Sequence, residues 1–229
     1  MLLKRKLQNV LMINSSVFVG LLLIGSISLA QGGAWIKLAD IPTPRCFLSG
    51  CTLDGKIYVI GGTESISSTG PSVGTMEVYN PTSDSWDTKA EMPTSRVEFA
   101  ACAVNGKIYA IGGVTNHGAS PIGTVEEYDP LTNSWDINKT PMPTPRYGAA
   151  YGVIDNKIYV AGGATGSNFI ISDILEIYDP VTDTWDSTNT TMLSAIYQPQ
   201  GAIINNMFYV IGGLVGPPPL AGTKDSSTV

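Results

Sequence analysis

The sequence predicts an all-β fold of about four repeated modules, each a sheet of four antiparallel strands and the last one incomplete. Three features recur at intervals of about 50 residues and carry this prediction. They are a glycine pair, a tyrosine and a tryptophan: Gly61-Gly62, Gly112-Gly113, Gly162-Gly163 and Gly212-Gly213; Tyr79, Tyr128 and Tyr178; Trp35, Trp86, Trp135 and Trp185. Such a period is typical of modules that bury their apolar surface only by stacking on their neighbours.

The first half of each module is predicted to be a β-hairpin. An apolar or alternating segment (47–53, 99–104 or 149–154) precedes a segment that reads KIYVIGG, KIYAIGG, KIYVAGG or MFYVIGG. The turns between them are Asp54-Gly55, Asn105-Gly106, Asp155-Asn156 and Asn205-Asn206. These residue types tolerate the positive φ angles of tight hairpin turns. The glycine pair ends the second strand, where we expect aromatic rings of neighbouring strands to lie against its backbone.

The second half of each module is predicted to hold two more strands. The segments TMEVYN, TVEEYD and DILEIYD each run into a proline, which removes a backbone donor and ends the strand. An Asx residue (Asp84, Asn133 or Asp183) then occupies a turn before the tryptophan that begins the fourth strand. Four antiparallel strands every 50 residues or so correspond to one blade of a β-propeller.

The complete pattern of arginine, hairpin turn, glycine pair, tyrosine and tryptophan resembles the kelch repeat over residues 35–229. The resemblance implies a kelch-type β-propeller of the exported bacterial type, with blades around a central channel. Repeats are expected at about 44–92, 95–142, 145–192 and, in part, 196–229, and residues 35–41 as a strand that completes a blade. The resemblance alone does not fix a function, because propellers host binding proteins and enzymes alike.

The carboxyl end of the sequence falls where a third strand is expected to begin. Thr228-Val229 matches Thr124-Val125, which starts the third strand of the second repeat. We therefore expect a fragment from the amino-terminal part of a longer propeller. A four-bladed ring closed by Trp35, with one defective blade, is the alternative.

Residues 1–30 are predicted to be a signal peptide, because Lys4, Arg5 and Lys6 precede an apolar stretch and small residues. An uncleaved membrane anchor is the alternative. Cleavage would leave one domain, residues 31–229, and lower the net charge from −6 to −9 by removing three basic side chains. The protein is then exported (periplasmic, secreted or extracellular). Its acidity disfavours nucleic acid and membrane partners, apart from the amino-terminal segment if it stays uncleaved.

Three arginines, Arg45, Arg96 and Arg146, recur just before the first strand, and the fourth repeat has Ile196 there. They could hold a carboxylate ligand near the channel mouth. In a structural role they could instead cap backbone carbonyls between blades, or pair with the glutamates that recur on the third strand: Glu77, Glu126 and Glu176. The repetition favours this structural role.

Glu98 and Tyr147 follow a repeat arginine but differ from their counterparts, Phe47 and Val97. They join the arginines as possible ligand-binding residues, because a site in a symmetric scaffold is built from departures from its symmetry.

No catalytic, metal or cofactor site is predicted. His117 is the single histidine and is expected to be a solvated loop residue. Cys46, Cys51 and Cys102 form an odd set, and small hydrophobic packing is the expectation for Cys51 and Cys102.

The loops between the second and third strands (63–74, 114–123, 164–172 and 214–227) vary in length and sequence, as recognition loops do. In one of them Phe169 and its neighbours form a candidate contact point. Asn138-Lys139-Thr140 and Asn189-Thr190-Thr191 fit the glycosylation pattern.

The leading hypothesis is a non-enzymatic, exported propeller that binds a protein or carbohydrate through these loops. The alternative, an enzyme fragment acting on sugars, is implied only by the resemblance. A sialic-acid-mutarotase-like enzyme would depend on the arginines and on residues beyond Val229. A galactose-oxidase-like copper site is disfavoured, because one histidine cannot supply its nitrogen ligands.

Overall fold

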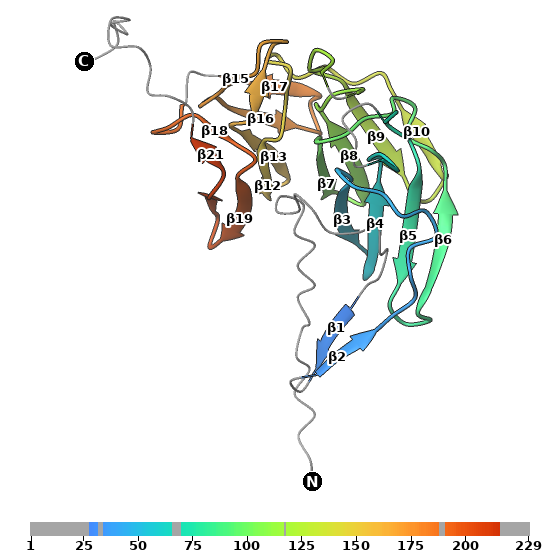
Figure 1. Cartoon of the computed structure of the whole chain (residues 1–229). Helices are drawn as coiled ribbons and strands as arrows, with labels where there is room; N and C mark the ends of the chain where they lie inside the picture. The colour runs from blue at the N-terminus through green and yellow to red at the C-terminus, as the bar shows by residue number, and fades with distance from the viewer. Residues whose placement is uncertain (1–27, 32–33, 66–69, 117, 188–190, 216–229) are drawn as a thin grey trace, which may run out of the picture.

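The structure is a computed structural model that describes residues 28–31, 34–65, 70–116, 118–187 and 191–215 (Figure 1). All regular secondary structure in these ranges is β-strand, as the sequence predicts. Among the described residues, none forms a helix long and apolar enough to cross a membrane.

Three complete four-stranded modules follow one another along the chain, each with its strands in sequential antiparallel order. Module 1 contains β3 (Ser49–Leu53), β4 (Lys56–Ile60), β5 (Met76–Asn80) and β6 (Ser85–Lys89). Module 2 contains β7 (Ala100–Val104), β8 (Lys107–Ile111), β9 (Val125–Asp129) and β10 (Ser134–Asp136). Module 3 contains β12 (Ala150–Ile154), β13 (Lys157–Ala161), β16 (Leu175–Asp179) and β17 (Thr184–Asp186).

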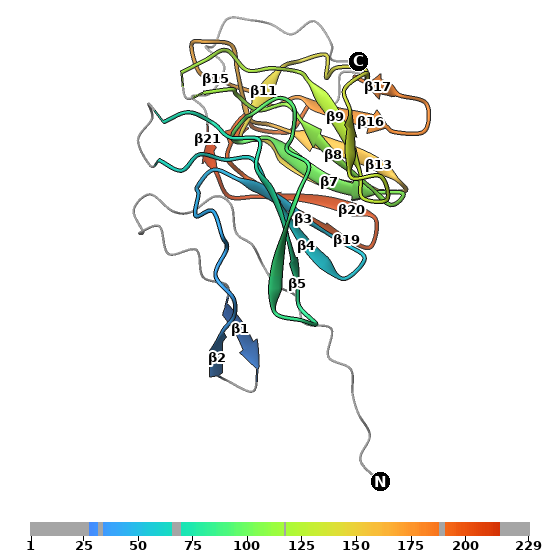
Figure 2. The same cartoon turned by 90° about the vertical axis from the view of Figure 1, so that its right-hand side faces the viewer.

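Module 4 is a two-stranded sheet in the described part of the chain, made of β19 (Gln200–Ile204) and β20 (Met207–Ile211). The modules form an arc in Figure 1, and the first strand of each contacts the first strand of the next: β3 with β7, β7 with β12 and β12 with β19. Figure 2 shows the same modules turned by 90° about the vertical axis. This arrangement is a β-propeller architecture, with the first strand of each module on the inner side.

The hairpin and Asx turns have the predicted backbone. Both central residues of each two-residue hairpin turn have positive φ, for example 50° at Asp54 and 72° at Gly55. The turn residues before the fourth strand also have positive φ, from 47° at Asp84 to 53° at Asp183. Asn, Asp and Gly reach this region at low cost, so these residues favour the observed register in the sheets of the four modules.

Apolar clusters lie between consecutive modules. Tyr58 and Ile60 of module 1 pack against Phe99 and Ile108 of module 2, and an equivalent cluster joins modules 2 and 3. The core thus depends on stacking, as the repeat period predicts.

A latch of three hydrogen bonds joins each module to the segment before it. Trp86 Nε1 donates to the carbonyl of Ala39 at 3.0 Å, and the Ala39 amide donates to Asp84 Oδ1 at 2.8 Å. Tyr79 Oη donates to the same carboxylate at 2.6 Å. The same three bonds recur with Trp135, Ala90, Asn133 and Tyr128, and with Trp185, Thr140, Asp183 and Tyr178. The tyrosine and tryptophan therefore keep their spacing because both serve one latch.

The glycine pairs have neighbours that differ in part from the expectation. A Cβ on Gly61, Gly112 or Gly162 would lie 2.6–2.7 Å from a backbone carbonyl of the next module, at the position of its repeat arginine or Ile196. Among the described residues, the nearest atoms to these glycine pairs include an aromatic ring, that of Phe99, only at Gly61. The glycines are thus needed chiefly for close backbone approach between modules.

Near the amino end, β1 (Ser28–Gln31) pairs with β2 (Ala34–Lys37). Signal cleavage after Ala30 would divide this hairpin. It stays a prediction, because residues 1–27 lie outside the described ranges. No blade strand among the described residues pairs with β2. Residues 38–41 nevertheless pack on module 1 through the latch at Ala39. In the later modules the equivalent latch residue, Ala90 or Thr140, follows the fourth strand of the preceding module.

Candidate binding site at the channel mouth

Four residues at one repeat position converge near the axis. Phe47, Glu98, Gly148 and Gln198 each precede the first strand of a module and have positive φ, between 53° and 60°. The amide of each of the last three donates to the carbonyl of its predecessor, at 3.2, 2.9 and 2.8 Å. This chain of hydrogen bonds holds the three non-glycine residues in a left-handed conformation that is otherwise uncommon. Their side chains therefore meet at one end of the channel.

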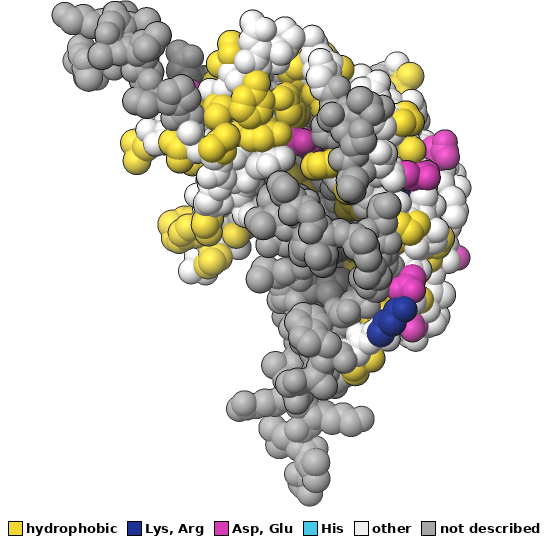
Figure 3. Space-filling view, viewed as in Figure 1, with side chains coloured by type: hydrophobic (Ala, Val, Ile, Leu, Met, Phe, Trp, Pro, Cys, Tyr) yellow, Lys and Arg dark blue, Asp and Glu magenta, His cyan; other side chains and the backbone are white. Residues whose placement is uncertain are grey.

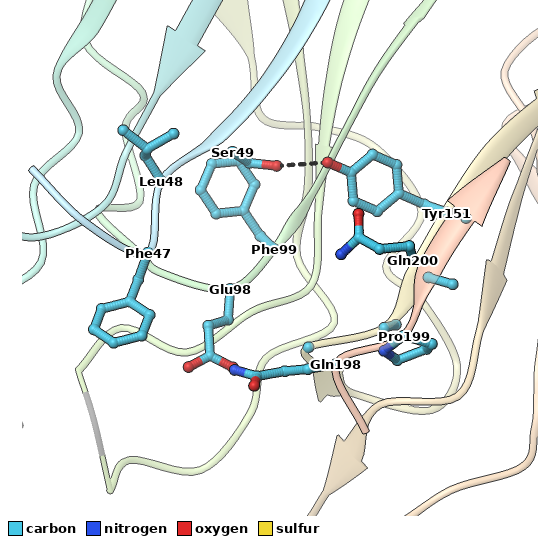
Figure 4. Close-up of a pocket in the computed structure, with 13 residues that line it drawn as sticks. Phe47, Leu48, Ser49, Glu98, Phe99, Tyr151, Gln198, Pro199 and Gln200 are labelled. Carbon is cyan, nitrogen blue, oxygen red and sulfur yellow. Dashed lines mark hydrogen bonds between the residues drawn. The ribbon is translucent and has the colours of Figure 1, made fainter. Parts of the chain in front are cut away.

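A pocket of about 190 Å³ opens at this place (Figure 4). Its lining includes Phe47, Glu98 and Gln198 from the repeat position, and Ser49, Tyr151 and Gln200 from the inner strands. Glu98 is the one charged side chain among the lining residues. The pocket is thus polar, with a single negative charge.

Tyr151 forms the floor of the pocket. Its hydroxyl lies 3.1 Å from Ser49 Oγ, so the side chain reaches from β12 of module 3 to β3 of module 1 (Figure 4). The equivalent positions in the other modules are Gly50, Ala101 and Gly201, which leave space for the ring. Burial raises the pKa of Tyr151 to about 12, so its phenol stays protonated at neutral pH.

Glu98 is fixed by two donors from module 4. Tyr197 Oη donates to Glu98 Oε2 at 2.6 Å, and Gln198 Nε2 donates to the same oxygen at 3.3 Å. The pKa values of Tyr197 and Tyr147 are raised, mainly by burial and to a smaller extent by the negative charge of Glu98. The carboxylate is therefore held in one orientation by protonated phenol and amide groups.

An aromatic shelf, defined as Tyr147, Phe169 and Tyr197, lies beside Glu98. The ring centroids are 4.7 Å apart for Phe169 and Tyr197, 5.6 Å for the two tyrosines and 6.4 Å for Tyr147 and Phe169. Phe169 precedes β15 (Ile170–Ile171), which pairs with β14 (Ala164–Thr165), and β14 pairs with β11 (Arg146–Tyr147). This small sheet brings the variable loop of module 3 to the channel mouth.

The repeat arginines lie elsewhere. Arg45, Arg96 and Arg146 are buried and form ion pairs with Glu77, Glu126 and Glu176 at 2.5, 2.9 and 2.8 Å. A threonine of each repeat, Thr43, Thr94 or Thr144, donates its amide and hydroxyl to the same glutamate. Burial lowers the pKa of Arg96 to about 10, against the opposing effect of Glu126. These arginines join the second and third strands of their own modules.

The structure thus brings together Glu98 and Tyr147 among the residues selected from the sequence. It adds Tyr197, Gln198, Tyr151 and Phe47, which the sequence analysis did not select as site residues. A comparison of all four repeats would have found two of them, since Gln198, like Glu98, replaces phenylalanine and glycine at one position, and Tyr151 replaces glycine and alanine at another.

The cysteines considered in the sequence analysis do not add to this site. The three cysteines are free, and burial raises the pKa of Cys51 to about 12. Among the residues that the structure describes, no three His, Cys, Asp or Glu side chains are grouped so as to hold a metal ion. His117 and Asn189 lie outside the described ranges.

Comparison with known families gives a match over residues 33–213 to the KLHDC2/KLHL20/DRC7 Kelch-repeats domain. The chain belongs to the kelch-repeat family. The repeated latch and glycine contacts are therefore features of a kelch propeller.

Individual kelch relatives match over shorter stretches. The chain is 34% identical to Kelch-like ECH-associated protein 1B of Danio rerio over 88 residues. This match covers 38% of this chain and 15% of that protein. It is 37% identical over 87 residues to Kelch-like protein 28 of Mus musculus, covering 36% and 15%. The matches thus span about one seventh of these relatives' lengths, so their activities and partners do not transfer to this kelch chain.

The solved structure of YjhT resembles this kelch chain in fold. The TM-score is 0.70 at 18% sequence identity, and the match covers 82% of this chain and 66% of YjhT. At this identity the similarity supports the propeller fold alone.

Proposed function

We propose that this kelch propeller is a non-enzymatic interaction module that binds a segment of another protein across the pocket and the aromatic shelf. The observation that carries the proposal is the convergence of Glu98 and Gln198, from two modules, on one pocket, where Tyr197 donates to Glu98. These residues break the repeat symmetry beside the variable loop of module 3, which carries Phe169.

The size of the pocket supports a macromolecular ligand. Drug-sized ligands occupy pockets of about 300–1,000 Å³. A pocket of about 190 Å³ suits one side chain, with the rest of the ligand lying on the surface.

That surface is apolar next to the pocket. Phe169 is 42% exposed, and Ile170, Leu214 and Val215 are exposed as well. Leu214 lies in β21 (Leu214–Val215), which pairs with β18 (Ile196–Tyr197) and so adjoins the shelf. Figure 3 shows hydrophobic side chains gathered over this part of the molecule. Exposed aromatic and aliphatic groups around a polar pocket are typical of protein-binding sites.

Binding of an acidic sugar is less well supported. The pocket lining contains Glu98 and no lysine, arginine or histidine, and the repeat arginines are buried in ion pairs. An anionic ligand would meet a negative charge there. The mutarotase-like alternative therefore lacks the arginine contacts on which it depends.

We also propose that the protein is exported, with residues 1–30 as its signal peptide, because the basic start and apolar stretch have that layout. Mass spectrometry of the mature protein from a secreting host tests this: an amino terminus at Gln31 supports it, and an intact Met1 opposes it.

The binding proposal is tested by selecting displayed peptides against residues 31–229 and measuring the affinity of the selected peptides. Phe169→Ser should weaken binding by about tenfold, since buried aromatic anchors dominate such interfaces. Leu131→Ser is the matched control, because Leu131 is an exposed apolar residue in the turn between β9 and β10, away from the pocket. Equal effects of the two substitutions would contradict the proposed site.

A further inference from the structure

We propose that the pocket is specific for a cationic side chain, a lysine ammonium or an arginine guanidinium of the bound protein, held by Glu98. This inference rests on the proposed function and names the chemistry of its anchor residue. It follows from the charge, the orientation and the surroundings of one carboxylate.

The first step concerns the available oxygen of Glu98. Both donors in the structure, Tyr197 Oη and Gln198 Nε2, bond to Oε2. No hydrogen bond to Oε1 is formed by the described residues, and in Figure 4 the second oxygen points away from Gln198, toward the side of Phe47. The carboxylate thus has one oxygen held by both donors, and one, Oε1, to which no described residue donates.

The second step concerns the cost of this arrangement. Glu98 is half-buried, and none of the lining residues carries a positive charge. A carboxylate removed from water without a charged partner is unfavourable. A ligand cation would compensate this charge and make a charge-assisted hydrogen bond to Oε1, which is stronger than one from a neutral donor.

The third step concerns the aromatic ring of Phe47 and the net negative charge of the chain. The ring of Phe47 lines the same pocket, and an ammonium or guanidinium is attracted to the face of an aromatic ring. The predicted mature chain has a net charge of −9, which favours approach of a basic segment. A divalent metal ion is a poorer fit, because calcium takes six to eight oxygen ligands and Glu98 is the sole carboxylate of the lining.

The experiment uses three pentapeptides that differ only in the central residue, which is lysine, norleucine or glutamate. Their binding to residues 31–229 is followed by NMR titration at low salt. The lysine peptide should bind about tenfold more tightly than the norleucine peptide, and the glutamate peptide more weakly than both. Glu98→Gln should abolish the preference for lysine over norleucine, since the amide can still accept from Tyr197 but carries no negative charge.

Glu91→Gln is the control, because Glu91 is exposed on the segment after β6 and lies outside the pocket lining. It should retain the preference. If Glu98→Gln does not fold, the wild-type preference for lysine should still fall as salt rises. Equal binding of the lysine and norleucine peptides would overturn the cationic anchor and leave the proposed function standing. Absence of binding by all three peptides at pocket resonances would overturn both.

Discussion

The hydroxyl of Tyr197 lies 2.6 Å from Glu98 Oε2, although 99 positions separate the two residues in the sequence. They belong to modules 4 and 2, and stacking of the modules brings them together. The pocket is therefore a property of the assembled propeller, which no module contains alone.

Tyr197→Phe removes the donor that orients Glu98 and keeps the ring of the aromatic shelf. A hydrogen bond to a charged group contributes about 1.5–3 kcal/mol. We expect a loss near the lower end of this range in the free energy of unfolding, and weaker binding of the lysine peptide. Chemical denaturation and NMR titration measure the two effects. Unchanged lysine binding would show that Glu98 does not need Tyr197 to act as the acceptor.

Arg96→Met tests the buried ion pairs of the repeat. Removing one partner leaves Glu126 buried without its counter-charge, which typically costs about 3–5 kcal/mol. The double variant Arg96→Met with Glu126→Leu should regain much of this stability in urea denaturation. Lys37→Met is the control, since Lys37 and Asp40 form an exposed pair worth at most about 1 kcal/mol. A double variant as unstable as the single one would exclude the uncompensated charge as the cause.

The fold could be predicted from the sequence because each module is specified locally and repeatedly. The Asx-Gly and Asx-Asn turns require positive φ, and the structure has it at all four hairpins. The tyrosine and tryptophan keep their spacing because both bond within one latch. Local backbone requirements repeated several times are visible without coordinates.

The site could be predicted only in part. Glu98 and Tyr147 were found because they break the symmetry between repeats. Tyr197 and Gln198 could not be connected with Glu98, because the contact depends on how far module 4 turns about the axis relative to module 2. Repetition already favoured the structural role of the arginines over ligand binding, and their burial in ion pairs supports that role.

Gly112→Ala and Gly212→Ala form a matched pair, since the two glycines occupy the same repeat position with φ of 70° and 72°. A Cβ on Gly112 would lie 2.7 Å from the Arg146 carbonyl, whereas a Cβ on Gly212 meets no described atom within 4 Å. Gly212→Ala should therefore cost only the backbone strain, of about 1 kcal/mol, and Gly112→Ala should cost about 1–3 kcal/mol more. Thermal melting compares them. Equal losses would show that close approach of the next module is unimportant at Gly112.

Acid should destabilise the latch. Hydrogen bonds from the Ala39 amide and from Tyr79 lower the pKa of Asp84 below 3.8, its ordinary value. The unfolded state therefore takes up the proton first, so the contribution of Asp84 is present above pH 3.8 and is lost as pH falls through its lowered pKa. Asp84→Asn should reduce this pH dependence, because Asn133 serves the equivalent latch without a charge. Melting temperatures measured from neutral pH down to about pH 3 test it, and an unchanged acid profile would contradict it.

The face of module 4 that carries Tyr209 and Ile211 should promote self-association of the protein. Tyr209 and Ile211 are 39% and 60% exposed, whereas Tyr58 and Ile60, which hold the same positions in module 1, are 5% and 0% exposed under module 2. Among the described residues β20 pairs only with β19, and an exposed apolar sheet face beside such an edge favours pairing with another sheet. Ile211→Lys should raise the monomer fraction in light scattering of residues 31–229, because a charge on this face opposes its burial. Val181→Lys is the control, since Val181 is an isolated exposed residue in the turn between β16 and β17. The same monomer fraction in both variants would mean that association, if seen, uses another surface.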